Sequence, residues 1–236
     1  MKASSNEFYT QGEYLRHNSS WNIEDAAWKA DVVYKLLKRN NIIIDNAVDV
    51  GCGAGGILEA LAKKDLGIKE FTGFDIAPDA IRIANERSSG RVQFINGDFT
   101  AGIHARADLL LLIDVIEHVD DFYGFLRKVK LKSEYFVFHI PLDLCCRSLL
   151  KPHILLQQRN AVGHIHYFSK EMVLWFLTDL GFTLLDFIYT EPDLDVKPAK
   201  TLKSFTKKYL RKLSFSLNKE LSIKLWGGYS IMVLLK

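Results

Sequence analysis

A glycine-rich turn lies between a short apolar run and a helical pattern. Residues 48–56 read VDVGCGAGG. Glycines let the chain turn tightly and let a ligand approach the backbone, and the free N–H groups of the following helix suit an anionic group. Gly51, Gly53 and Gly56 fit G-x-G-x-x-G, with Asp75 at the distance of a ribose-binding acid. The turn predicts a nucleotide-type ligand.

Strand and helix patterns alternate on either side of this turn. The run Leu109–Ile113 is apolar throughout, as expected for a strand whose sheet has helices on both faces. Repeated strand–helix–strand units predict an α/β fold with a Rossmann-like, doubly wound sheet. We expect strands at residues 47–50, 71–75, 92–95, 109–113, 135–140, 182–189 and 229–235, and helices at 25–38, 57–63, 78–87 and 170–179.

Composition and charge narrow the class of protein. The 236 residues are 48% hydrophobic and 25% charged, which is typical of a globular domain and not of a disordered chain. The formal net charge of +3 makes nucleic acid an unlikely partner. No signal-peptide pattern and no apolar run of roughly 18 residues is present. The three cysteines form neither a disulfide framework nor a zinc-type pair, so a cytoplasmic location is expected.

The glycine turn alone fits both NAD and S-adenosylmethionine, but the residues around it favour the methyl donor. Asp49 can meet the cationic methionyl end of S-adenosylmethionine, whereas it would face a pyrophosphate unfavourably. Asp98 follows the third strand and can accept a hydrogen bond from an adenine amine, with Phe99 against the ring. The fourth strand ends in DVIEHV, residues 114–119. An NAD-dependent oxidoreductase is the less favoured alternative.

Taken together, these motifs resemble those of a known family. VDVGCGAGG, GFDIAPDAI, INGDF and LLLIDVIEHVDD resemble the cofactor motifs of class I S-adenosylmethionine-dependent methyltransferases, above all the small-molecule branch that includes the ubiquinone-biosynthesis O-methyltransferases. GHIHYFSKEMVLWFLTDLGF resembles the segment before the family's sixth strand. The resemblance implies methyl transfer, at oxygen, to a small-molecule or lipid-linked acceptor. A non-catalytic partner subunit that binds S-adenosylmethionine is the alternative.

The resemblance also implies how the chain is organised. The terminal GGYSIMVLL resembles the family's antiparallel seventh strand, so the sheet should be seven-stranded and otherwise mostly parallel, with a small helical cap. We expect one domain over residues 1–236. Its parts are an N-terminal arm and helix (1–40), a cofactor-binding core (41–191), a basic helical insertion (192–226) and the last strand (227–236).

The donor-binding residues follow from the same resemblance. Lys29 lies on a helix that looks like the one closing over the donor in relatives, and it is expected to pair with the donor carboxylate; a solvated lysine is the alternative. The other roles fall to Asp49, Gly51 and Gly53 for the methionyl part, Asp75 for the ribose, Ile76, Asp98 and Phe99 for the adenine, and Asp114 and Ile116 for the pocket floor.

An oxygen nucleophile usually needs a base, and histidine is the common choice. Four histidines follow strand ends, where the site of this fold lies: His118, His139, His164 and His166. We expect His118 or His166 to act as the base or to orient the substrate; structural bracing is the alternative. The other three, His17, His104 and His153, are expected to be exposed.

Asp114, Glu117 and His118 also resemble a divalent-metal cluster found in some relatives. There a metal gathers substrate hydroxyls as a Lewis acid. Most chains with this motif need no metal, so none is expected here.

Two further segments bear on the acceptor. Residues 199–215 predict a basic amphipathic helix, because the seven cations between Lys197 and Lys212 alternate with an apolar stripe and no acid intervenes. The simpler interpretation is a cap with a solvated lysine face; the alternative is peripheral contact with an anionic membrane. The stripe consists of Leu202, Phe205, Tyr209 and Leu213, and a second apolar set, Leu149, Leu150, Ile154, Leu155 and Leu156, is expected in the core or along the acceptor pocket.

Overall fold

The structure is a computed structural model that describes residues 21, 23–102, 106–191 and 202–236, without the side chains of 202–205 and 207. Seven strands form one sheet in the order β3-β2-β1-β4-β5-β7-β6. β1 to β5 pair in parallel, and β7 pairs antiparallel with both β5 and β6. The predicted doubly wound sheet with an antiparallel last strand is confirmed. The strands are β1 Asn46–Val50, β2 Glu70–Asp75, β3 Val92–Asn96, β4 Ala107–Ile113, β5 Ser133–Pro141, β6 Leu184–Thr190 and β7 Ser230–Leu235.

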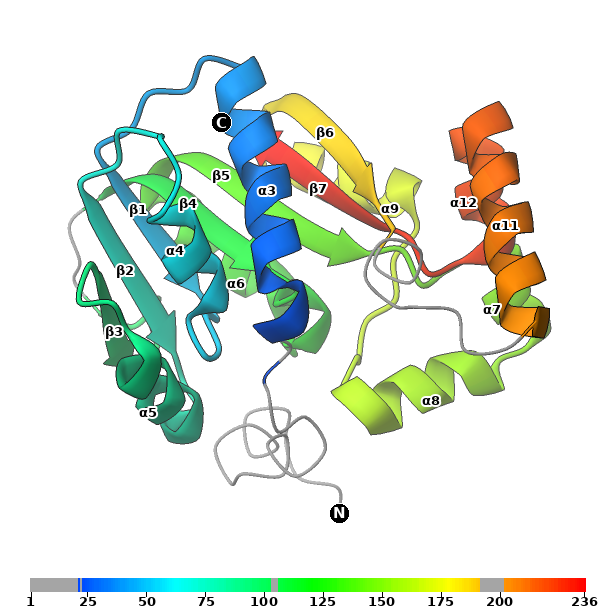
Figure 1. The fold of residues 1–236 in the computed structure, drawn as a ribbon, viewed down its shortest axis with the longest axis horizontal. Helices are drawn as coiled ribbons and strands as arrows, with labels where there is room; N and C mark the ends of the chain where they lie inside the picture. Colours follow the sequence, from blue (N-terminus) through cyan, green and yellow to red (C-terminus); the bar gives the residue numbers. More distant parts are fainter. Residues whose placement is uncertain (1–20, 22, 103–105, 192–201) are drawn as a thin grey trace.

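Helices cover both faces of the sheet (Figure 1). α3, α4 and α5 pack on one face, and α6 and α9 pack on the other. α7, α11 and α12 lie together on the right of the view, and α8 lies below the sheet. The helices are α3 Ile23–Arg39, α4 Gly56–Leu61, α5 Pro78–Arg87, the 3-10 turn η1 Ile116–His118, α6 Phe122–Lys130, α7 Cys146–Leu150, α8 His153–Val162, α9 Lys170–Asp179, α11 Leu202–Leu217 and α12 Lys219–Trp226.

β4 shows why this sequence needs two helical layers. Successive side chains of a strand point to opposite faces of the sheet. Leu109 and Leu111 enter the core cluster that contains α3, whereas Leu110 and Leu112 enter the cluster that contains α6. All four are fully buried, which explains a strand without polar alternation.

The apolar residues after β5 do not lie where the sequence places them. Leu149, Leu150 and Leu156 are exposed by 61%, 83% and 59%, so they belong neither to the core nor to a pocket wall. α7 and α8 project from the sheet, and α8 buries none of its residues. The side chains of this segment that reach the cavity described below are Gln158 and Val162.

α11 is the predicted basic helix, but it presents a different face to the fold. Arg211 is buried, and its Nη2 donates to the carbonyls of Gly227 and Gly228 at 2.7 and 3.2 Å. Tyr209 and Leu213, expected in the packed stripe, are exposed. Arg211 is therefore not part of a solvated cationic face. Lys197 and Lys200, the side chains of Leu202, Lys203, Phe205 and Lys207, the N-terminal arm with His17, and His104 lie outside the described residues.

The ranges that the structure describes contain no helix with the length and apolarity needed to cross a bilayer.

Candidate active site

A cavity of about 650 Å³ opens at the carboxyl ends of β1, β2, β4 and β5. This is the edge at which open α/β sheets bind their ligands. Trp21, which precedes α3, and Ile23 and Ala26 in the first turn of α3 line the cavity. Seven predicted residues line it, namely Lys29, Gly51, Gly53, Asp75, Ile76, Asp114 and His118, together with Glu117, His139 and His164.

The glycine turn is shaped for close approach. Gly51 has φ +80°, and a Cβ there would lie 2.6 Å from a methyl of Val115. Gly53 has φ +53°, and its N–H donates to the Asp75 carboxylate at 2.8 Å. Both positions therefore need glycine for a backbone reason as well as for ligand access.

Asp75 ends β2 and faces the cavity from a buried position. One of its oxygens accepts from Gly53 N–H and the other from Ala77 N–H, each at 2.8 Å. Burial raises the pKa of this carboxyl, although these two amide contacts and that of Ile76 act in the opposite direction. Asp75 thus fixes the turn and has remaining lone pairs that can accept hydrogen bonds at the cavity wall.

Asp49 lies under the glycine turn, fully buried and outside the cavity lining. Neither of its oxygens accepts a hydrogen bond in the described part of the chain. Burial and the charge of Asp75 raise its pKa to about 8, and Lys29 opposes the shift. A buried carboxylate of this kind is costly until a cation compensates it, which fits the role expected from the sequence toward the methionyl end of the donor.

Lys29 is held by two aspartates. Its Nζ lies 2.6 Å from Asp114 and 2.9 Å from Asp25. Burial alone would lower the Lys29 pKa, but the two carboxylates raise it well above its usual value. The structure therefore shows an ammonium engaged within the protein, in place of the solvated lysine considered as the alternative.

Asp114 links this lysine to β5 and β6. Its other oxygen contacts Nδ1 of His139 at 2.5 Å, and Nε2 of His139 contacts the hydroxyl of Thr190 at 2.7 Å. Asp114 has φ +55°, a left-handed conformation that is uncommon outside glycine. Although burial opposes it, His139 and Lys29 hold the pKa of Asp114 well below its usual range. The carboxylate is ionised and fixed at the edge of the cavity.

Besides Asp49, three predicted donor-binding residues do not line the cavity. Phe99 is buried in the core with its ring centroid 5.0 Å from that of Phe74, and Ile116 is buried in the same cluster. Asp98 is exposed and accepts from the N–H and hydroxyl of Thr100 at 2.7 and 2.8 Å. The floor expected from Asp114 and Ile116 is formed instead by Asp114 with the neighbours of Ile116, Val115 and Glu117.

The histidines that line the cavity are only partly the ones that the sequence favoured. His118, His139 and His164 line the cavity, and His166 does not. Nε2 of His166 contacts the main-chain carbonyls of Val119 and Asp120 at 2.9 and 3.3 Å, and its ring packs against Phe122. His166 therefore lies outside the cavity with its ring held by the main chain, and this position does not favour the predicted role of base or substrate-orienting group.

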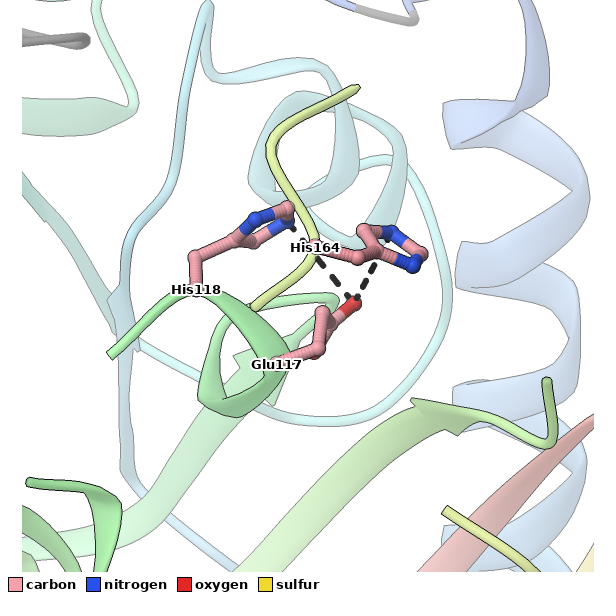
Figure 2. A group of neighbouring side chains, drawn as sticks. All are labelled: Glu117, His118 and His164. Carbon is pink, nitrogen blue, oxygen red and sulfur yellow. Dashed lines mark ion pairs between the residues drawn. The ribbon is translucent and has the colours of Figure 1, made fainter. Parts of the chain in front are cut away.

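Glu117, His118 and His164 converge on one point at the cavity wall (Figure 2). An oxygen of Glu117 lies 3.9 Å from Nε2 of His118 and 4.0 Å from Nε2 of His164. Burial and the charges of Asp114 and Asp143 raise the pKa of Glu117, whereas burial and His164 lower that of His118 to about 4. Among the described residues, these three place side-chain ligand atoms close enough together to hold a metal ion. The set predicted from the sequence had Asp114 in the place of His164, and it is corrected accordingly.

A doubly wound sheet with an antiparallel seventh strand, a glycine turn after β1 and an acid at the end of β2 defines a class I S-adenosylmethionine-dependent methyltransferase. A family model described as a methyltransferase domain matches residues 22–186, and the chain belongs to this family. The NAD-dependent oxidoreductase is thereby set aside.

Curated relatives match over a shorter stretch. The chain is 39% identical over 87 residues to a ubiquinone biosynthesis O-methyltransferase of Methylobacterium sp. (strain 4-46), a match that covers 34% of this chain and 33% of that protein. A second protein of this name, from Methylobacterium nodulans, is 36% identical over the same shares. The matched segment thus spans about a third of these relatives.

Solved structures match over nearly the whole chain. The magnesium protoporphyrin IX methyltransferase of Synechocystis PCC 6803, crystallised with S-adenosylhomocysteine, gives a TM-score of 0.61 at 13% identity, covering 98% of this chain and 96% of that one. A chain from the complex of the Haloferax volcanii Trm112 methyltransferase activator with a methyltransferase gives 0.67 at 17% identity, covering 99% and 97%. At such identities the likeness concerns the fold.

Proposed function

We propose that this chain transfers the methyl group of S-adenosylmethionine to an oxygen of a small-molecule or lipid-linked acceptor. The observation that carries the proposal is the single cavity that joins the glycine turn and Asp75 to the Glu117, His118 and His164 group. The donor would lie over the turn and the acceptor against the histidines. The names of the ubiquinone relatives, matched over a third of their length, favour oxygen as the attacking atom.

The reaction is a direct displacement at carbon. The acceptor oxygen bonds to the methyl carbon while the bond between this carbon and sulfur breaks. The electron pair of the broken bond stays on sulfur, so the sulfonium becomes the neutral thioether of S-adenosylhomocysteine. The hydroxyl proton passes to the imidazole of His118. The protein supplies alignment of oxygen, methyl and sulfur, and it excludes water.

Donor binding provides the first test. Calorimetry is expected to show micromolar binding of S-adenosylmethionine or S-adenosylhomocysteine and much weaker binding of NAD. Asp75→Ala removes the acceptor for the ribose hydroxyls and frees two backbone N–H groups. It should weaken donor binding by about 1.5–3 kcal/mol, which is roughly 10- to 150-fold.

Asp79→Ala is the matched control, because Asp79 is a half-buried aspartate in the first turn of the next helix and lies outside the cavity lining. It should leave the donor affinity unchanged. Equal or tighter binding of NAD by the wild type contradicts the proposal. Tight donor binding without methyl transfer to a broad panel of phenolic and alcoholic acceptors indicates the non-catalytic partner subunit instead.

The exposed face of α11 favours peripheral contact with an anionic membrane. Tyr209, Leu213 and Leu217 are exposed by 63%, 45% and 79%, and residues 196–219 contain no acid. Apolar side chains beside cations, with no acid among them, fit the interface of an anionic bilayer better than bulk water. Such contact would bring a lipid-linked acceptor to the protein.

Sedimentation with vesicles tests this contact. The protein is expected to bind phosphatidylglycerol-containing vesicles at low salt and to release them at high salt, because each cation near an anionic surface contributes about 1 kcal/mol and salt screens it. The quadruple variant Lys208→Gln, Tyr209→Ser, Lys212→Gln, Leu213→Ser should lose sedimentation and keep donor binding. The control Lys35→Gln, Lys38→Gln removes two exposed lysines from α3 and should bind as the wild type does. A wild type that ignores these vesicles contradicts the contact.

A further inference from the structure

We propose that His139 and Thr190 are positioning residues for the methyl donor, because through Asp114 they hold the place where the amino-acid end of S-adenosylmethionine binds. The sequence places His139 near the site without a role and gives no signal at Thr190. The inference rests on the proposed function, since it takes the donor to lie over the glycine turn.

The two residues end a chain of contacts that starts on α3. Nζ of Lys29 lies 2.6 Å from one oxygen of Asp114, and the other oxygen lies 2.5 Å from Nδ1 of His139. Nε2 of His139 lies 2.7 Å from the hydroxyl of Thr190. Because β7 lies between β5 and β6 in the sheet, this last contact joins two strands that do not pair with each other. The chain thus connects α3, the residue after β4, and the strands β5 and β6.

The imidazole of His139 is held at both nitrogens. An ionised carboxylate only accepts hydrogen bonds, so the Nδ1 atom that faces Asp114 carries a proton. In the neutral ring, Nε2 then accepts from the hydroxyl of Thr190. Both contacts are buried, since the side chain of His139 and the residue Thr190 are each only 2% exposed. Losing either partner in such a place is costly, and the ring therefore keeps one orientation.

His139 fixes Asp114 by its main chain as well as by its side chain. The N–H of Asp114 donates to the carbonyl of His139 at 3.0 Å. Asp114 has φ +55°, and a residue other than glycine keeps such a conformation only where its surroundings impose it. The next residue, Val115, abuts the glycine turn, since a Cβ at Gly51 would lie 2.6 Å from a methyl of Val115. The Asp114 carboxylate is therefore held beside the first glycine of the turn.

The pair of Lys29 and Asp114 matches the two charges of an amino acid. Both residues line the cavity. An ammonium has three donors, and Asp25 and Asp114 take two of those of Lys29, at 2.9 and 2.6 Å. The third is left for a carboxylate, and the lone pairs that Asp114 keeps can accept from an α-ammonium. Such hydrogen bonds depend on distance and direction, so the position of the Asp114 carboxylate decides how well the amino-acid end of the donor binds.

Thr190 acts on the donor through two other side chains. Without its hydroxyl, Nε2 of His139 is left buried without a partner, which costs more than the lost hydrogen bond itself. The ring relieves this cost by moving, and the Asp114 carboxylate, which Nδ1 holds, moves with it. Serine at position 190 keeps the hydroxyl, whereas valine keeps the branched shape without it.

Two ligands separate positioning from general damage to the fold. S-adenosylhomocysteine carries the amino-acid end of the donor, and 5′-methylthioadenosine has the same adenosine and sulfur but lacks that end. Calorimetry measures the first, and its displacement measures the second. Thr190→Val should weaken S-adenosylhomocysteine binding by about 3- to 10-fold and His139→Leu by about 10-fold or more, while 5′-methylthioadenosine binding changes by less than about twofold in either variant.

Two further variants test the route from Thr190 to the donor. Thr190→Ser should bind both ligands as the wild type does, because it keeps the hydroxyl. The double variant His139→Leu, Thr190→Val should bind as His139→Leu does, because the hydroxyl acts only through the imidazole.

Thr178→Val is the matched control, because the hydroxyl of Thr178 donates to the main-chain carbonyl of Leu174 on α9, outside the cavity lining. It should leave both affinities unchanged. The inference is overturned if Thr190→Val and His139→Leu bind S-adenosylhomocysteine as the wild type does, or if both ligands weaken to the same extent, as a purely structural role would produce. A wild type that binds neither ligand contradicts the proposed function and the inference that rests on it. Binding of both ligands by the wild type, with an unaltered ratio in the variants, contradicts the positioning role alone.

Discussion

Replacing Lys29 with methionine is expected to lower the free energy of unfolding by about 3 kcal/mol or more. The ammonium is 8% exposed and compensates two aspartates, Asp25 on its own helix and Asp114 at the end of β4. Without it Asp114 keeps only His139, and two carboxylates remain close together with no cation between them. Removing one partner of a buried ion pair is far more damaging than removing an exposed pair. Urea denaturation at neutral pH measures the loss, and the melting temperature should fall by roughly 10 °C.

Lys64→Met is the control for this substitution. Lys64 pairs with Asp31, which lies on helix α3 as Lys29 does, but the side chain of Asp31 is 54% exposed. Its loss should cost at most about 1 kcal/mol. Lys29→Met combined with Asp114→Asn should be less damaging than the sum of the single changes, because the groups are coupled. If Lys29→Met and Lys64→Met lower the free energy of unfolding equally, the buried ion pair stabilises the fold no more than the exposed pair does.

The sheet could be predicted because its signal is local. Each strand is a short apolar run after a turn, and the run at β4 is apolar on both faces because both faces are covered. α8 gives no such signal, since it buries no residue and therefore has no apolar stripe. α11 was predicted as a helix from the spacing of its apolar residues. Its packed face could not be predicted, because Arg211 donates to the carbonyls of Gly227 and Gly228, which follow 16 and 17 residues later in the chain.

The site could be predicted where strand ends determine it. Asp75 and Asp114 follow parallel strands, and the carboxyl ends of such strands meet at one edge of the sheet. The apolar residues Phe99, after Asp98, and Ile116, near Asp114, were assigned less well, because both complete the core. The choice between His164 and His166 depends on the path of one loop, which the main-chain bonds to Glu117 fix and which no local pattern reveals.

Replacing His118 with alanine should lower kcat by about 100- to 10,000-fold, the range that general acid–base catalysis contributes. His118 follows β4 on η1 and lines the cavity where the acceptor is proposed to lie. The donor is proposed to lie on the other side of the cavity, over the glycine turn, so its dissociation constant should change less than threefold. Single-turnover kinetics at saturating donor measures the chemical step apart from product release.

His166→Ala is the comparison variant, because it tests whether the fall in kcat is specific to His118. From the sequence the two histidines are equal candidates, but His166 is occupied by the carbonyls of Val119 and Asp120 and lies outside the cavity lining. The variant should lose some stability, because two main-chain carbonyls lose their donor, while kcat stays within a fewfold of the wild-type value. A large fall in kcat for His166→Ala with an unaffected His118→Ala would exchange the two roles and move the acceptor away from the Glu117 side of the cavity. Unchanged turnover in both variants would leave proton removal to solvent and reduce His118 to a residue that packs beside His164.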